Sequence, residues 1–505
     1  MRAVLLVVLA FLAGCAGHDT YRMTLDACNA VIALSSTNDE TTLADSLSTC
    51  ALQTHVSPGL ADKPFHLAFL ELDERTNALK EPAQMDALLA HLDRNRQNVV
   101  VAFVHGWRHD AMVGDLDVRR FRALLAYSNA YLDHRCEVAG RYCGATLTGV
   151  YVGWRARSFA EPPNHSFALW SLGAGPTFWS RKALSERHAE TTLARLTEIQ
   201  DRLTLRSNDP TADKMLVVGH SFGGNMLAHA LSPLYRDMVD NHAHGAAMPS
   251  ALGDLAVIVN PAAEASKWTA LQRAFRTRYG GEDRLASSRM EAAFPVDQAP
   301  LLVSITSSCD WNLLEVPAEG GSQRKVACDT ATGRLFPLGM ALAGHSGPEQ
   351  TVTIGHLDPA YRDGKPETLY GTSHEFIINL GANEGTEYAR AGRDPLAVCS
   401  IVDSWVIEAR RRSGGRQWDS DYSPRGRSTL TPTNRDLDTR VQFRHALSPN
   451  NSGQRQFPSV VSANFPFWNM RSPDSVIREH GGFVSHALWC AMNQLVLDNV
   501  TAPPH

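Results

Sequence analysis

The segment MLVVGHSFGGNMLAHAL, residues 215–231, has the pattern of a strand, a sharp turn and a helix. Four apolar residues lead into GHSFG at 219–223, and a stretch with helical periodicity, rich in alanine and leucine, follows. A G-x-S-x-G turn between a strand and a helix presents its serine at the end of a sheet, because the tight backbone leaves almost no room for flanking side chains. The segment therefore predicts a nucleophilic Ser221 on an α/β scaffold.

A second Gly-His-Ser sequence, GHSGP at 344–348, lacks these surroundings. It has no second glycine at the motif position, no β-branched run precedes it, and Pro348 follows it. Only the copy at 219–223 has the strand and the helix that the chemistry requires.

Composition limits the classes of protein that the chain can represent. Its 505 residues are 44% hydrophobic and 20% charged, which is enough for a large core in one elaborated domain or two. The net charge is −5 and no basic block is present, so no nucleic-acid partner is expected.

The N-terminus has the features of an export signal. Met1-Arg2 is a short basic start, residues 3–13 are apolar, and LAGC follows at 12–15. The apolar run is too short to span a bilayer. LAGC resembles the lipobox of bacterial lipoproteins, which implies cleavage before Cys15 and a lipid on its thiol. By resemblance to enteric sorting rules, Ala16 then indicates an anchor in the outer membrane, facing the periplasm.

Nine cysteines are present, and eight remain once Cys15 is set aside. In an oxidising compartment an even number favours disulfides, with free buried thiols as the alternative. Neighbour pairing is the simplest arrangement: Cys28–Cys50, Cys136–Cys143, Cys309–Cys328 and Cys399–Cys490. No C-x-x-C spacing and no histidine at zinc-finger distance occurs, so no metal is expected.

Strand-like and helix-like segments alternate through much of the chain, which predicts an α/β fold with a mostly parallel sheet flanked by helices. The expected strands are 65–72, 97–104, 146–154, 215–218, 254–260, 300–306 and 465–470, and the expected helices are 85–94, 118–134, 181–206 and 484–500. The predicted organisation is a signal peptide at 1–15, an N-terminal helical region at 16–64, a core at 65–310, an insertion or cap-like region at 311–464, and a C-terminal strand, histidine loop and helix at 465–505.

Three motifs together resemble the α/β-hydrolase superfamily: HGW at 105–107, GHSFGG at 219–224, and an aspartate after a later strand. The resemblance covers residues 65–306 and resumes at 465. It implies a Ser-His-Asp triad in the chain order Ser, Asp, His, with neither metal nor organic cofactor.

The acid and the base of this triad follow from their expected places. Asp310 comes just after the strand at 300–306, where the superfamily carries its acid. Some lipases carry the acid after the preceding strand, but this chain has asparagine in VNPA at 259–262, with Glu264 as the fallback. His480, in REHGG between the last strand and the last helix, is the expected base, and two glycines should let its loop move. His486, at the start of the last helix, is the alternative.

The oxyanion formed during acyl transfer needs backbone N–H donors that are already in place. The expected donors are Phe222, which follows the nucleophile, and Trp107 in HGW.

The expected function is therefore that of a lipid-anchored, periplasm-facing serine hydrolase that cleaves carboxylic esters of small molecules or lipids through an acyl-enzyme on Ser221. Two other hypotheses for the function stay open. One is a non-catalytic envelope lipoprotein that uses this fold for binding, since a fold does not fix a function. The other is a thioesterase or amidase with the same triad. The acyl chain, the alcohol and the oligomeric state cannot be read from the sequence.

Overall fold

The computed structural model describes the chain in two compact units. Unit 1 comprises Met1–Leu205 and Thr211–Leu227, and unit 2 comprises Arg206–Pro210 and Ala228–His505. The described residues are 18–24, 26–34, 48–57, 60–157, 177–205, 212–279, 293–295, 298–307, 316–317, 323–324, 336–357, 361–362, 365–366, 376–379, 442–445, 465–472, 477, 480–484 and 486–497. Each unit is a mostly parallel sheet with flanking helices, so the predicted α/β class is confirmed.

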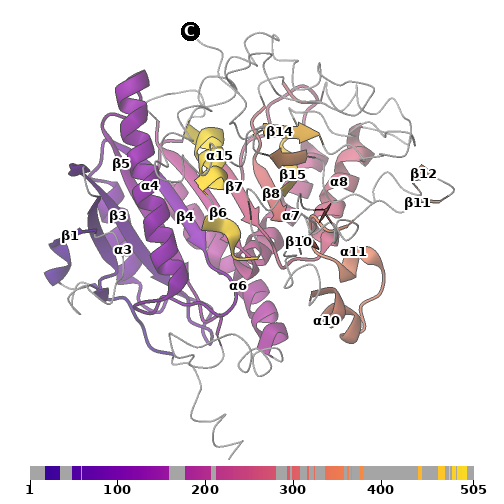
Figure 1. Cartoon of the computed structure of the whole chain (residues 1–505), viewed down its shortest axis with the longest axis horizontal. Helices are drawn as coiled ribbons and strands as arrows, with labels where there is room; N and C mark the ends of the chain where they lie inside the picture. Colours follow the sequence, from indigo (N-terminus) through magenta and orange to yellow (C-terminus); the bar gives the residue numbers. More distant parts are fainter. Residues whose placement is uncertain are drawn as a thin grey trace, which may run out of the picture. The chain divides into compact units, whose positions relative to one another are not determined.

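The strands of unit 1 run in the order β1-β2-β3-β5-β4-β6 (Figure 1). They are β1 (Val31–Ala33), β2 (Leu52–Ser57), β3 (Leu60–Glu71), β4 (Gln97–Val104), β5 (Ala145–Gly153) and β6 (Lys214–His220). All neighbours pair in parallel except β2 and β3. All of β6 and nearly all of β4 are buried, as their apolar runs predict. Because β4 and β6 are neighbours, the loop after β4 emerges beside the turn after β6.

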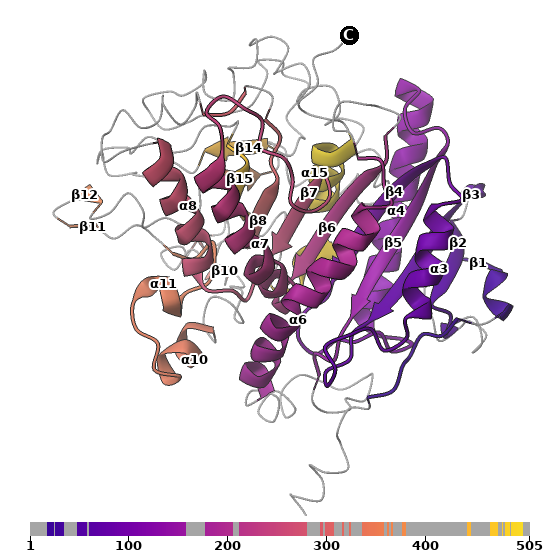
Figure 2. The same cartoon turned by 180° about the vertical axis from the view of Figure 1, so that it is seen from behind.

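Helices cover both faces of this sheet. They are α3 (Ala83–Leu92), α4 (Leu116–Ala139), α6 (Thr177–Gln200) and the first turns of α7 (Phe222–Asn241), which continues into unit 2. Helix α4 lies on one face, whereas α3 and α6 lie on the other (Figures 1 and 2). The Asp115 side chain accepts a hydrogen bond from Asp117 N at the start of α4, and Gly140 ends that helix in a left-handed conformation.

The prediction of a helical region at 16–64 is wrong for the residues that the structure describes. Apart from a short 3-10 helix, η1 (Asp26–Asn29), these residues mainly form β1, β2 and the beginning of β3. The first four residues of β2 alternate between half-buried and buried positions against β3, so pairing at the sheet edge outweighs a mixed local pattern.

Two of the predicted disulfides are present. Cys28 is bonded to Cys50, with 5.5 Å between the Cα atoms, and Cys136 is bonded to Cys143, with 4.7 Å. The other half-cystine candidates, Cys309, Cys328 and Cys399, lie outside the described residues, as does the side chain of Cys490.

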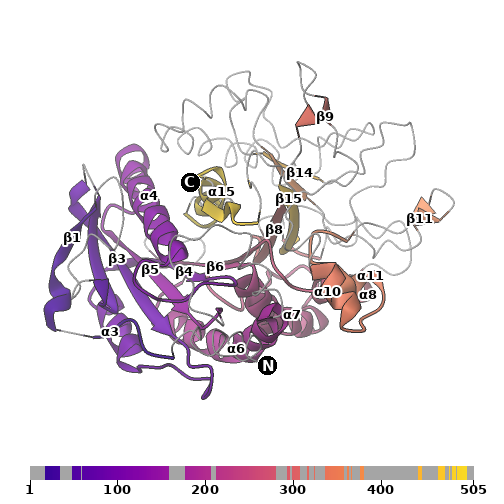
Figure 3. The ribbon, with the colours of Figure 1, turned by 60° about the horizontal axis from the view of Figure 1, so that its bottom comes forward.

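The strands of unit 2 run in the order β7-β8-β15-β13-β14. They are β7 (Leu255–Val259), β8 (Leu302–Ser307), β15 (Phe467–Ser472), β13 (Phe376–Asn379) and β14 (Gln442–His445). Within this sheet β14 pairs antiparallel with β13, whereas the other described pairs are parallel, and β8 and β15 lie side by side (Figure 3). The predicted insertion at 311–464 therefore supplies two strands to the sheet of unit 2.

The remaining elements of unit 2 are helices and short strand pairs. The helices are α8 (Ala265–Tyr279), α10 (Phe336–Leu342), α11 (Pro348–Thr351), η6 (Gly482–Val484) and α15 (His486–Leu497). The strand pairs are β9 (Val316–Pro317) with β10 (Gln323–Arg324), and β11 (Tyr361–Arg362) with β12 (Lys365–Pro366). Among the helices of the described part, none has the length and apolar character needed to cross a membrane.

Candidate active site

Ser221 occupies a strained position between β6 and α7. Its φ is 56°, which places a serine in the left-handed region at a cost of about 1–2 kcal/mol. Both Ser221 and the preceding His220 are buried. Strain of this kind persists only where the surroundings fix the backbone, so the packing of the turn must hold it. We call residues 219–223 the serine turn.

The glycines of the serine turn leave no room for side chains. A Cβ on Gly219 would lie 2.6 Å from the carbonyl oxygen of Gly223, and a Cβ on Gly223 would overlap the carbonyl oxygen of Val104. On the facing loop, a Cβ on Gly106 would lie 2.8 Å from the Cβ of Ser221. The end of β4 and the 105–107 loop are therefore in direct contact with the serine turn.

Two backbone N–H groups near Ser221 are available as donors. Neither the N–H of Trp107 nor that of Phe222 has a hydrogen-bond partner among the residues that the structure describes. The two side chains are neighbours, with ring centroids 6.4 Å apart, and Phe178 at the start of α6 packs against both, at 5.3 and 4.7 Å. Backbone N–H donors and apolar side chains are the groups that an oxyanion next to an apolar acyl chain requires.

His105 holds the loop that carries Trp107. Its Nδ1–H donates to Gly106 O at 2.9 Å, and its Nε2 accepts from the backbone N–H of Trp154 at 3.1 Å. The ring stacks between Tyr151 and Trp154, with centroids 5.3 and 5.6 Å away. Burial lowers the pKa of His105 to about 3, so the ring is neutral at physiological pH. With both nitrogens engaged, His105 is a structural residue and not a base.

Behind this loop lies a buried ionic cluster that the sequence reasoning missed. It comprises His109, Asp110, Asp115, Asp117 and Arg157. His109 contacts Asp115 at 3.0 Å and Asp117 at 3.4 Å, while Arg157 contacts Asp110 at 2.9 Å and Asp115 at 2.7 Å.

The charges of the ionic cluster shift its pKa values. Although burial acts in the opposite direction, the carboxylates of Asp117 and Asp115 raise the pKa of His109 to about 9. Burial raises the pKa of Asp110 to about 6, against the effect of Arg157. The signal in the sequence was the presence of three aspartates, Asp110, Asp115 and Asp117, shortly after HGW.

His480 lies in a compact turn of unit 2, residues 480–484, which we call the histidine loop. Its backbone oxygen accepts a hydrogen bond from Asn260 Nδ2 at 2.9 Å. The same amide accepts from Ser307 N through Oδ1 at 2.8 Å, and Asn260 N donates to Ile305 O at 2.9 Å. Asn260 is fully buried with a φ of 44°. One side chain therefore joins the carboxyl ends of β7 and β8 to the histidine loop.

Gly482, the second of the two glycines after His480, is closely packed, whereas we expected both glycines to let the loop move. A Cβ on Gly482 would lie 2.9 Å from Ile477 Cγ2. The indole N–H of Trp489 donates to Phe483 O at 2.9 Å and ties the loop to α15. The alternative base, His486, is the first residue of α15, as its position in the sequence predicts.

The other predicted site residues fall into two groups. Asp310 and Cys15 lie outside the described residues. Glu264, the fallback acid, is held in an ion pair with Lys267 at 2.8 Å. The structure thus brings together the serine turn and the 105–107 loop in unit 1, and Asn260 with His480 in unit 2.

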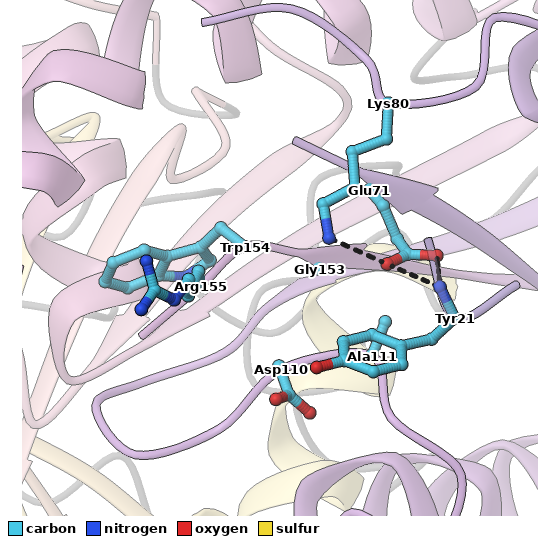
Figure 4. A pocket seen from close by; sticks show the side chains of 8 residues that line it. All are labelled: Tyr21, Glu71, Lys80, Asp110, Ala111, Gly153, Trp154 and Arg155. Atoms are coloured by element: carbon cyan, nitrogen blue, oxygen red, sulfur yellow. Dashed lines mark hydrogen bonds and ion pairs between the residues drawn. The ribbon is translucent and has the colours of Figure 1, made fainter. Parts of the chain in front are cut away.

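A small pocket in unit 1 is lined by Tyr21, Glu71, Lys80, Asp110, Ala111, Gly153, Trp154 and Arg155 (Figure 4). The Glu71 carboxylate accepts hydrogen bonds from the N–H groups of Tyr21 and Arg22 and lies 3.5 Å from Lys80 Nζ. These protein groups satisfy the buried charge, so the pocket has a structural explanation. Within the described ranges, no group of three or more His, Cys, Asp or Glu side chains could hold a metal ion.

Comparisons with known proteins do not assign the chain to a group. No family profile matches it, and no curated protein shows significant sequence similarity to it.

Proposed function

We propose that this protein is a serine hydrolase of the α/β-hydrolase fold that cleaves carboxylic esters. The observation that carries the proposal is the left-handed backbone of Ser221, held between a buried parallel strand and a helix. The neighbouring N–H groups of Trp107 and Phe222 support it further. A strained serine with two donors beside it is the arrangement that acyl transfer requires.

In the proposed reaction, Ser221 Oγ attacks the ester carbonyl carbon while its proton passes to His480, which Asp310 orients. The N–H groups of Trp107 and Phe222 stabilise the oxyanion. When the carbon–oxygen bond to the alcohol breaks, His480 returns the proton to the departing oxygen and an acyl-enzyme remains. Water then attacks the acyl-enzyme with His480 as base, and the carboxylic acid leaves.

The proposal includes the location of the enzyme. Lipid on Cys15 would anchor the mature chain to the outer membrane, facing the periplasm, where both small esters and lipid esters are candidate substrates. The aromatic wall of Trp107, Phe178 and Phe222 favours an apolar acyl group over a charged one.

Labelling with a fluorophosphonate tests the activated serine. The full-length protein in detergent should be labelled, and Ser221→Ala should abolish labelling and lower p-nitrophenyl acetate hydrolysis by roughly 10³-fold or more. Ser346→Ala is the matched control, because Ser346 stands in the other Gly-His-Ser sequence and is exposed; it should be labelled like the wild type.

Failure has two distinct forms. A well-folded wild-type protein that is not labelled would favour the non-catalytic lipoprotein. Labelling at Ser221, with turnover of thioesters or amides but not of esters, would keep the triad and change the substrate class.

A further inference from the structure

We infer that Asn260 is a positioning residue for His480, an assignment that rests on the proposed function. Asn260 follows the last residue of β7, and its side chain reaches a residue far away in the sequence. It donates to His480 O and accepts from Ser307 N, so both ends of the amide are used.

The chemistry at this position suits an amide and excludes close substitutes. A leucine of similar volume would remove the hydrogen bonds to Ser307 N–H and His480 O, and a hydrogen bond of this kind contributes about 0.5–1.5 kcal/mol. An aspartate could still accept from Ser307 N–H, but its carboxylate would face the carbonyl oxygen of His480. Of these residues, only asparagine satisfies the donor and the acceptor together.

The backbone at Asn260 adds to this selectivity. With a φ of 44°, the residue lies in the left-handed region, which asparagine tolerates better than most residues other than glycine. Its side chain is fully buried, so water does not compete for the two hydrogen bonds. The position is therefore built for one side chain in one orientation.

The Asn260 side chain with its two hydrogen bonds, which we call the clamp, also connects two parts of the proposed triad. Ser307 is the last residue of β8, and the chain continues from it to Asp310 within a few residues. The Asn260 amide thus ties the backbone of the proposed base to the strand that leads to the proposed acid. This explains why asparagine occupies a turn where an acid could have stood.

The test uses full-length protein and two readouts. Asn260→Gly removes both side-chain hydrogen bonds but keeps the left-handed backbone unstrained. Asn77→Gly is the matched control: Asn77 has a φ of 53°, and its Oδ1 accepts from His188 Nδ1 at 2.6 Å in unit 1. The readouts are amide hydrogen exchange of residues 301–307 and 480–484, and the kinetics of fluorophosphonate labelling and p-nitrophenyl acetate hydrolysis.

Asn260→Gly should speed exchange in both segments and lower kcat by about 10–100-fold, as loss of a supporting contact in an active site does, with KM changed by less than about threefold. Asn77→Gly should leave exchange in both segments and kcat unchanged. In a His480→Ala background, Asn260→Gly should slow labelling no further, because its effect acts through the imidazole.

Several results would overturn the assignment. Faster exchange with unchanged kcat would show a clamp that does not position the base. An additive loss in the His480→Ala background would indicate a general structural role. Unchanged exchange and unchanged kcat would remove the clamp altogether. A wild-type protein that is not labelled would remove the proposed function, and the assignment with it, even where exchange shows that the clamp exists.

Discussion

The same three residues, Gly-His-Ser, occur at 219–221 and at 344–346, in two very different settings. The first copy is buried between a strand and a helix, whereas the second is exposed between α10 and α11. In the first copy the serine itself is left-handed, at a φ of 56°. In the second the left-handed residues are glycines, Gly344 and Gly347, which adopt that conformation without strain.

The glycines of the two copies also serve different purposes. A Cβ on Gly223 would overlap neighbouring backbone, whereas a Cβ on Gly344 or Gly347 would meet nothing within 4 Å. In the serine turn, glycine allows two backbones to approach; in the exposed copy, it allows the chain to turn. The comparison shows that the density of packing, and the residue that carries the strain, distinguish the serine turn from the same three residues at 344–346.

The largest expected effect is that of a methyl group in the serine turn. Gly223→Ala should lower the free energy of unfolding by about 3 kcal/mol or more, or prevent folding, because backbone atoms of Val104 cannot move aside like a flexible side chain. Gly344→Ala should cost only about 1–2 kcal/mol, from its left-handed backbone. Urea unfolding of both variants gives the comparison.

Gly144→Ala gives the reference value for the change in unfolding free energy, since Gly144 has open space around it and no left-handed φ. A loss at Gly223 no larger than that at Gly344 would mean that close packing does not account for the glycine of the serine turn.

The two serines also differ in the charges near them. The ionic cluster lies behind the 105–107 loop, and His109 is the residue that should give it a pH dependence. A pKa raised from 6.5 to about 9 stabilises the fold fully below pH 6.5, and that stabilisation is lost as the pH rises through 9. Each pKa unit corresponds to about 1.4 kcal/mol, so His109→Gln should cost about 3 kcal/mol at pH 6.

The decrease in the free energy of unfolding caused by His109→Gln should become steadily smaller between pH 7 and pH 10, as measured by urea unfolding at each pH. His109 is among the groups that lower the pKa of Asp110, which is about 6, so the range above pH 7 is the one that reports His109 itself. The exposed His345 of the second Gly-His-Ser sequence is the control, and His345→Gln should change stability by less than about 0.5 kcal/mol throughout. A loss at His109 that does not vary with pH would show that packing, and not charge, explains its contribution.

Much of the fold could be predicted because its signals are local. The run at 97–104 became β4 with the predicted bounds, and the strand–turn–helix at 215–231 gave β6 and α7. The edge strands could not be predicted in the same way. β1 depends on pairing with β2, β2 on pairing with β3, and β13 on pairing with β15. Their residue patterns therefore indicate a strand only once the partner strand is in place.

The candidate site also has features that depend on adjacent residues and features that depend on residues far apart in the chain. The serine turn follows from adjacent residues, so its motif could be recognised in the sequence. The role of Asn260 depends on His480, 220 positions away in the chain, and the ionic cluster needs Arg157 from beyond β5. No periodicity or spacing in the sequence indicates contacts between residues so far apart in the chain. From the sequence alone, Asn260 was only an asparagine at a position where some lipases carry the acid.

The smallest expected effect tests where the strain lies. Ser221→Gly should be more stable than Ser221→Ala by about 1 kcal/mol, because glycine adopts a φ of 56° without penalty while alanine retains the strain. At Ser346, which is not among the left-handed residues, the order should reverse, since glycine there only adds freedom to the unfolded chain. Both replacements at 221 remove the proposed nucleophile, so the difference between them reports the backbone strain less the freedom that glycine adds to the unfolded chain, and it can be measured by thermal unfolding. An alanine variant more stable than the glycine variant at both positions would mean that Ser221 is not strained, and the feature that best separates the two Gly-His-Ser sequences would be lost.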